Sequence, residues 1–209
     1  MHIDLWFPSV IGKSDCPFFD EVKDSYRKRI SSDEVKVVST GRFITPTFEY
    51  NSAGFCAQRV HEKGEFKRLN DWIITQVQEY ADTHKFPGVY YCKDSWVVDY
   101  PVNSAQFFRS HPGSIISGIF FIEGQEDDVP VLFKNPVTDM KNALGHTAYE
   151  NKAHLVNELT YNQVAYPPKT GQLLLWRSHL ESGCNMKTLA CKRTAFVYNF
   201  DVMVTLKSV

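Results

Sequence analysis

The sequence predicts a mainly β domain of the α+β class: a jelly roll of the double-stranded β-helix, cupin-like type, with two N-terminal helices packed on one sheet. From Val89 onward, short runs rich in Val, Ile, Phe and Tyr alternate with Gly, Pro, Asn and Asp, which is typical of a sandwich or barrel. Before Val89, two stretches have helical periodicity. Because 209 residues suffice for one sizeable core, we expect a single domain over 1–209, with a helical part at 1–88 and the jelly-roll core at 89–209.

The first helix is predicted from Cys16 to Ile30, where apolar residues recur at spacings of three and four and Pro17 suits the first turn. A strand-like segment, Ile3 to Val10, precedes this helix. The segment Val35 to Ser52 follows it and is rich in Thr, Val and aromatic residues, so we expect an irregular strand or hairpin arm there.

The second helix has the clearest pattern in the chain and is predicted from Glu65 to His84. Pro87-Gly88 ends it, because proline cannot continue a helix and glycine favours a turn. One face carries an apolar stripe that a neighbouring sheet would bury. The stripe consists of Phe66, Leu69, Trp72, Ile73, Val77, Tyr80 and Ala81.

The core is predicted to contain six strand segments bounded by turn residues. They are Val89 to Cys92, Ser95 to Tyr100, Ile115 to Ile122, Val131 to Phe133, Leu173 to Trp176 and Thr194 to Leu206. A polar insertion, Asp139 to Pro168, interrupts them and carries His146 and His154. An insertion of this length is commonly a lid or a partner-binding surface, and the alternative is a solvated loop. We expect residues 139–168 to bind a protein partner or a larger assembly, with a homo-oligomer as one form of it.

Charge and cysteine usage exclude several classes of protein. The net charge of −1 gives no electrostatic footprint for nucleic acid or for an anionic membrane. No apolar stretch reaches the length of a membrane span. The five cysteines are odd in number and show no CxxC spacing, so neither a disulfide framework nor a zinc ribbon is indicated. We expect a cytoplasmic protein with neither nucleic acid nor membrane as a partner.

The core also carries several short motifs in a fixed order. Gln106 to Ser114 reads Gln-Phe-Phe-Arg-Ser-His-Pro-Gly-Ser and precedes Ser117-Gly118. Further on, Val131 to Pro136 ends in Phe-Lys-Asn-Pro, Gly171 to Trp176 reads Gly-Gln-Leu-Leu-Leu-Trp, and Arg193 to Phe200 ends in Asn-Phe. Together these motifs resemble the 2-oxoglutarate/Fe(II)-dependent oxygenase-like family, in particular its small bacterial and bacteriophage members. The resemblance implies the jelly-roll fold and, for an active member, Fe(II) and 2-oxoglutarate as cofactors.

The metal-binding motif of the resembled family is degraded in this chain. Such oxygenases hold Fe(II) with two histidines and a carboxylate, or with a third histidine. The resemblance places Arg109 and His111 at the first ligand pair and Ser182 at the distal ligand position. A guanidinium stays protonated and only donates hydrogen bonds, and a serine hydroxyl is a poor Fe(II) ligand. We therefore expect His111 to be a hydrogen-bonded remnant of the site. The alternative is a rebuilt site in which His179 joins His111 and an Asp or Glu, although His179 otherwise suits an exposed turn.

The cosubstrate position is better preserved. The resemblance implies that Arg193 clamps the distal carboxylate of 2-oxoglutarate, a role that suits a bidentate guanidinium. Alternatively, Arg193 is a structural residue that pairs with a local acid. If Arg109 faces the same barrel mouth, the two guanidinium groups would form an anion pocket without metal, and this is our hypothesis for the pair.

The sequence thus favours an oxygenase-fold protein that has lost Fe(II) binding, carries no cofactor and has a structural or protein-binding role. A phage virion or accessory component, in the host cytoplasm or the virion, is the specific form suggested by the family analogy. The alternative is an active Fe(II)/2-oxoglutarate-dependent hydroxylase, a dioxygenase with altered metal ligands. A third hypothesis, a metal-free carbohydrate- or anion-binding jelly roll, rests on the aromatic content.

Overall fold

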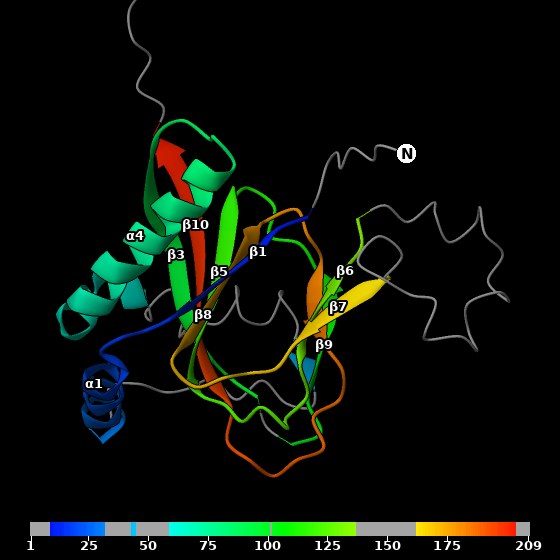
Figure 1. The fold of residues 1–209 in the computed structure, drawn as a ribbon. Helices are drawn as coiled ribbons and strands as arrows, with labels where there is room; N and C mark the ends of the chain where they lie inside the picture. Colours follow the sequence, from blue (N-terminus) through cyan, green and yellow to red (C-terminus); the bar gives the residue numbers. More distant parts are fainter. Residues whose placement is uncertain (1–8, 32–42, 45–58, 101, 137–161, 204–209) are drawn as a thin grey trace, which may run out of the picture.

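Two five-stranded sheets form the molecule in the computed structural model, which describes residues 9–31, 43–44, 59–100, 102–136 and 162–203 (Figure 1). The first sheet has the order β1-β8-β5-β10-β3. Its strands are β1 (Ile11–Asp15), β3 (Val89–Asp99), β5 (Ile116–Glu123), β8 (Gln172–Arg177) and β10 (Thr194–Met203). All neighbours in this sheet are antiparallel.

The second sheet has the order β2-β4-β9-β6-β7. Its strands are β2 (Phe43–Ile44), β4 (Ala105–Arg109), β6 (Val131–Lys134), β7 (Gln163–Tyr166) and β9 (Ser182–Cys184). Only the short β2 runs parallel to its neighbour, β4, among the strand pairs that the structure describes. Two antiparallel sheets whose neighbouring strands are mostly distant in sequence confirm the predicted double-stranded β-helix.

Two helices pack on one face of the first sheet, as predicted. α1 spans Phe19–Ser31 and α4 spans Lys67–Thr83, and the short 3-10 helices η1 (Val60–Glu62) and η2 (Gly64–Phe66) lead into α4. Figure 1 shows α4 lying beside β3. The hydroxyl of Tyr198 on β10 donates a hydrogen bond to Asn70 Oδ1 of α4 at 3.1 Å. The predicted stripe of α4 is largely buried because it contacts the aromatic side chains of the sheet. This helix-side core includes Leu69, Ile73, Val77, Tyr26, Phe120 and Phe196. None of the described helices is long and apolar enough to cross a membrane.

The central strand β10 separates two cores. Phe196, Tyr198 and Phe200 belong to the helix-side core, whereas Ala195 and Val197 belong to a second core between the sheets. Successive side chains of a strand point to opposite faces, so a strand buried on both faces needs a continuous apolar run. The apolar run Ala-Phe-Val-Tyr at residues 195–198 meets that need. The second core, which includes Trp96, Phe121, Phe133 and Trp176, surrounds the candidate site.

Some predicted elements differ from the observed ones. The two runs predicted at Val89 to Cys92 and Ser95 to Tyr100 form one strand, β3. The polar residues between the two runs do not end the strand, because a shift in its register against β10 accommodates them. The predicted Ile3 to Val10 strand lies mostly outside the described residues, and the first observed strand starts at Ile11. Of Val35 to Ser52, only β2 is described.

Four of the described strands were not predicted: β1, which begins just after the predicted Ile3 to Val10 strand, and β4, β7 and β9. β4 and β9 are short and carry polar residues, so they lack the apolar alternation that indicates a strand. β7 lies inside the predicted 139–168 insertion and pairs with β6, so the C-terminal end of that segment is part of the second sheet and not a loop. Residues 137–161, which include His146 and His154, lie outside the described residues.

Candidate functional site

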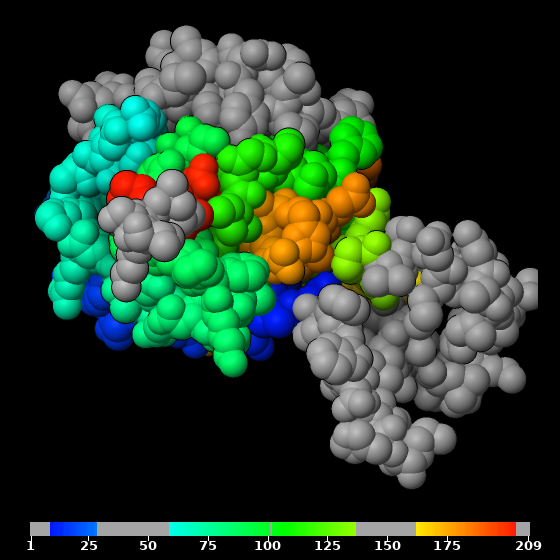
Figure 2. Space-filling view, turned by 90° about the horizontal axis from the view of Figure 1, so that it is seen from above, coloured from blue at the N-terminus to red at the C-terminus, as the bar shows by residue number. Residues whose placement is uncertain are grey.

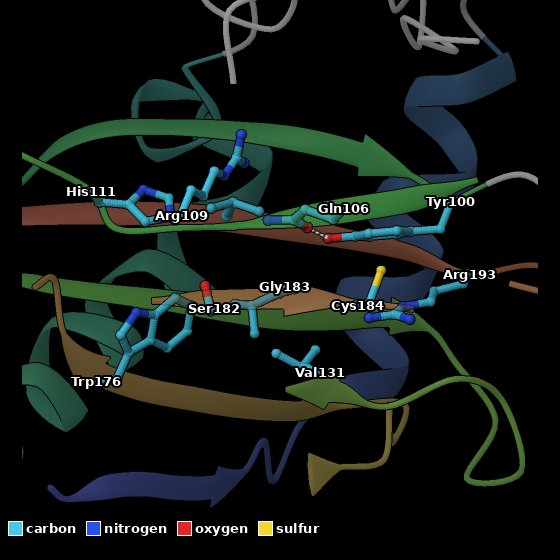
Figure 3. Close-up of a pocket in the computed structure, with 12 residues that line it drawn as sticks. Tyr100, Gln106, Arg109, His111, Val131, Trp176, Ser182, Gly183, Cys184 and Arg193 are labelled. Carbon is cyan, nitrogen blue, oxygen red and sulfur yellow. Dashed lines mark hydrogen bonds between the residues drawn. The ribbon is translucent and has the colours of Figure 1, made fainter. Parts of the chain in front are cut away.

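A small pocket lies between the two sheets, at the centre of the second core (Figure 3). Its cavity volume is about 20 Å³, which is room for about one water molecule. Both sheets contribute to its wall. The lining residues are Tyr100, Gln106, Arg109, His111, Ile119, Val131, Trp176, Ser182, Gly183, Cys184, Arg193 and Val197.

The structure brings together the three residues at the predicted metal-ligand positions. Arg109 of β4 and Ser182 of β9 are direct partners in the antiparallel register. His111 follows β4, and its amide donates a hydrogen bond to the carbonyl of Ser178 at 2.9 Å. All three side chains line the pocket. The three positions that the resemblance singled out therefore lie at one cavity.

Gly183 allows β9 to approach β4 closely at this point. A Cβ on Gly183 would lie 2.8 Å from the carbonyl oxygen of Gln106, which is a fixed backbone atom. Only glycine fits without a shift of the strands. The Gly-Cys sequence after Ser182 therefore helps to hold the two halves of the candidate site together.

His111 is buried in an aromatic and hydrogen-bonded setting. Its ring centroid lies 6.2 Å from those of both Trp96 and Trp176. Its side chain also forms a hydrogen bond with Asn199, whose Oδ1 accepts a hydrogen bond from Ser117 at 2.9 Å. Burial, and secondarily the positive charge of Arg109, lower the pKa of His111 to about 4, while the Asn199 hydrogen bond opposes the shift. The imidazole is therefore neutral at physiological pH.

The side chains at the metal-ligand positions implied by the resemblance do not fit Fe(II). One imidazole, one serine hydroxyl and one guanidinium replace the expected two histidines and carboxylate. None of the pocket residues named above is an Asp or Glu, and within the described part of the chain no cluster of three or more His, Cys, Asp or Glu side chains could hold a metal ion. Arg109 also brings a fixed positive charge to the place where a dication would bind.

His179 lies away from His111, in a second pocket. This pocket is on the face seen in Figure 2, where the end of β10 (red), the β4–β5 turn (green) and the β8–β9 turn (orange) adjoin. Its lining includes Tyr90, Arg177 and Val202. Burial and then the charge of Arg177 lower the pKa of His179. The structure therefore does not assemble the alternative His111/His179 site.

Arg193 is almost completely buried, with 1% of its surface exposed. Its guanidinium carbon lies 4.2 Å from the ring centroid of Tyr100 and 5.7 Å from that of Phe121. Nη1 donates to the carbonyl of Val129 at 2.7 Å. Nε and Nη2 are buried and have no hydrogen-bond partner among the described residues. The predicted alternative, a pair between Arg193 and a local acid, has no support in the ion pairs between described residues.

Both predicted arginines line the pocket, but they lie at different ends of it. Figure 3 shows the guanidinium of Arg193 beside Cys184, while that of Arg109 is directed away from both. Burial raises the pKa of the Cys184 thiol, and the nearby charge of Arg193 opposes the rise. The geometry thus gives a pocket with one arginine at each end, not a two-arginine clamp on one point.

A buried ion pair close to Arg193 was not predicted from the sequence. Lys187 Nζ lies 3.1 Å from Asp128 Oδ1, and the two side chains are 1% and 0% exposed. Asp128 immediately precedes Val129, the hydrogen-bond partner of Arg193. No sequence signal could have revealed this pair, because isolated Lys and Asp residues between strands normally indicate solvated turns.

Comparisons with known proteins agree with this fold. A family model described as "Putative 2OG-Fe(II) oxygenase" matches residues 94–199, just over half of the chain. No curated protein matches by sequence.

Several solved structures share the fold. A Pseudomonas putida prolyl-4-hydroxylase has a TM-score of 0.57 and 9% identity, over 93% of this chain and 94% of that one. AviO1 from Streptomyces viridochromogenes Tue57 has a TM-score of 0.59 and 9% identity, over 97% and 94%. HygX from Streptomyces hygroscopicus, solved with iron bound, has a TM-score of 0.56 and 9% identity, over 93% and 83%. The chain spans only 54% of a 2OG-Fe(II) oxygenase family oxidoreductase from Burkholderia pseudomallei, at a TM-score of 0.45. At such identities the likeness shows the fold alone.

Proposed function

This chain belongs to the 2OG-Fe(II) oxygenase family, and we propose that within it the protein has lost Fe(II) binding and acts by binding instead of by hydroxylation. The observation that carries the proposal is the pairing of Arg109 with Ser182 in the β4–β9 register, next to His111. One neutral imidazole remains where a metal centre needs several convergent ligands. A guanidinium at the same end of the pocket repels a dication.

The second part of the proposal is that the pocket binds an anion through Arg193. Near this end the structure buries two cations, Arg193 and Lys187, and one anion, Asp128, so that one positive charge is left to be balanced. Two guanidinium nitrogens of Arg193 are buried without partners among the described residues, and a carboxylate would satisfy them. Arg109 adds positive potential from the opposite end.

The size of the cavity limits what can bind. About 20 Å³ holds one water-sized group and not a whole 2-oxoglutarate molecule. A dicarboxylate therefore enters only if lining side chains move. Gln106 is one side chain that would have to move, and its Oε1 accepts a 3.2 Å hydrogen bond from the Tyr100 hydroxyl. A small carboxylate such as formate or acetate needs less rearrangement.

Thermal unfolding in the presence of EDTA tests this part. Formate, acetate, succinate and 2-oxoglutarate should each be added separately, because a ligand that binds only the folded state raises Tm. We expect at least one carboxylate to raise the Tm of the wild type and not that of Arg193→Met. Arg177→Met, which removes an exposed arginine, should keep the response. An equal response in Arg193→Met, or no response in the wild type to any of them, would contradict an anion site at Arg193.

The alternative of an active hydroxylase is tested separately. Wild-type protein supplied anaerobically with Fe(II) and 2-oxoglutarate, and then with oxygen and ascorbate, should form no succinate above the level without protein. Succinate formation that depends on the protein would support the hypothesis of an active hydroxylase and contradict the proposed loss of iron chemistry.

We further propose that residues 139–168 bind a protein partner or a larger assembly, of which a phage virion is the form suggested by family analogy. The described end of this segment supports the idea, because β7 lies at the edge of the second sheet as far as the described strands go, and Val164 on it is 39% exposed. Edge strands offer unpaired backbone groups to an added strand. Amide hydrogen exchange should therefore slow in residues 162–166 when the native assembly is present, and unchanged exchange there would remove this proposal.

A further inference from the structure

The connection between β9 and β10, the orange loop at the bottom of Figure 1, holds a buried lysine against a cysteine. Lys187 Nζ donates to the carbonyl of Leu189 at 2.7 Å, to Asp128 Oδ1 at 3.1 Å and to Cys191 Sγ at 3.1 Å. The backbone is fixed as well, since the amide of Lys187 donates to the carbonyl of Ser104 at 2.8 Å. The amine and the thiol are therefore held within reach of each other by several independent contacts.

Two further observations make this contact chemically significant. Cys191 is only partly buried, unlike Cys16 and Cys184, which are buried. Asp128 Oδ2 is buried and has no hydrogen-bond partner in the described part of the chain. The other oxygen of this carboxylate, Oδ1, contacts the Lys187 ammonium at 3.1 Å and is placed to take a proton from it, and a lysine that gives up its proton becomes a nucleophile.

We propose that Lys187 and Cys191 form a covalent sulfur–nitrogen bond when the protein meets hydrogen peroxide. First, the Cys191 sulfur attacks the peroxide: an S–O bond forms, the O–O bond breaks, and the products are a sulfenic acid and water. Then Lys187 passes a proton to Asp128, and the free Nζ attacks the sulfenic sulfur. The S–N bond forms as the S–O bond breaks, and the departing oxygen takes the second proton of the amine and leaves as water.

The reaction balances without another reactant. One thiol, one amine and one peroxide give one sulfenamide and two waters, with the sulfur oxidised and the peroxide reduced. Asp128 keeps the proton from Lys187, so neither partner of the former ion pair is left as a buried lone charge. The bond would fix the loop that leads into Arg193 and is independent of the function proposed for the pocket.

Peptide mapping after peroxide treatment of the full-length protein tests this inference. A Met186→Leu background is used, because Met186 is 53% exposed and takes up oxygen on its own. Trypsin cuts after an unmodified Lys187 but not after one whose Nζ is bonded to sulfur. We expect a single peptide of residues 178–192 that is lighter by about 2 Da, the mass of two hydrogens. Reduction with dithiothreitol should restore the peptides 178–187 and 188–192.

Three variants in the same background identify the atoms. Cys191→Ser should abolish the light peptide. Lys187→Arg, which keeps the charge but offers a poor nucleophile, should do the same. Cys92→Ser should retain it, because Cys92 is also partly buried but its Sγ donates to the carbonyl of Asp94 at 3.3 Å, and no hydrogen bond joins it to a lysine among the described residues. Normal cleavage after Lys187 in the treated parent, with oxygen atoms added to Cys191, would overturn the inference whether or not the variants fold.

Discussion

The neutral, buried state of His111 makes acid a specific perturbation of this fold. The ordinary pKa of histidine is about 6.5, and burial together with Arg109 lowers the pKa of His111 to about 4. The unfolded chain therefore binds a proton more tightly than the folded one between these values. The stability that His111 contributes is fully present above pH 6.5 and is lost as the pH falls toward and through about 4.

The magnitude follows from the same two values. A tenfold change in proton affinity corresponds to about 1.4 kcal/mol, so a fall from 6.5 to about 4 corresponds to about 3 kcal/mol of free energy of unfolding. Since His111 is only 6% exposed, solvent screening does not remove most of this effect. Such a loss is a large fraction of the stability of an ordinary domain.

Urea unfolding in EDTA, between about pH 7 and about pH 4, measures the effect. His111→Asn cannot titrate but can still hydrogen-bond to Asn199, so its free energy of unfolding should fall by about 3 kcal/mol less than that of the wild type over this range. The pKa of His179 is lowered in the same direction, but this side chain lies on an exposed turn where solvent screens its surroundings, so His179→Asn should stay much closer to the wild type than His111→Asn does. Parallel curves for the wild type and His111→Asn would refute the reasoning. If His111→Asn does not fold, the imidazole resonances of wild-type His111 should still titrate well below pH 6.5.

Two further substitutions test the geometry of the site. Gly183→Ala places a methyl group 2.8 Å from a backbone oxygen of β4, so we expect the free energy of unfolding in urea to fall by about 2 kcal/mol. Gly64→Ala, with nothing within 4 Å of the added Cβ, should lower it far less. Equal losses in the two variants would show that β4 and β9 are not packed this closely. Arg109→His combined with Ser182→His should create measurable affinity for Zn²⁺ or Co²⁺ in calorimetric titration, because it surrounds His111 with two more imidazoles, and each single change should do much less. A folded double variant that binds these metals no better than the wild type would mean that the three side chains do not converge.

The sequence predicted the parts of the fold whose pattern is set by burial. The stripe of α4 and the continuous apolar run of β10 correspond to the two faces on which these elements are packed. β4 and β9 could not be predicted from pattern, because each is short and exposes polar side chains to a small cavity. Their pairing depends on a close approach at Gly183, which only the three-dimensional structure reveals.

Some features of the candidate site were likewise predictable from the sequence, and others were not. The meeting of Arg109, His111 and Ser182 was predictable from the order of the motifs, because the resemblance supplied the fold that brings them together. Closeness in sequence was a poor guide for His179, since the turn between β8 and β9 carries it to another pocket. The buried pair of Asp128 and Lys187 joins residues far apart in the chain and has no local signature.

The measurement that bears most directly on the loss of iron chemistry is the Fe(II) content of the protein after anaerobic loading and gel filtration. The Arg109→His, Ser182→His double variant, treated in parallel, serves as the control with a restored ligand set. We expect the wild type to retain far less than one iron per chain, because its described pocket offers one imidazole beside a guanidinium. Retention of about one iron per chain by the wild type, reversible by chelator, would contradict the account.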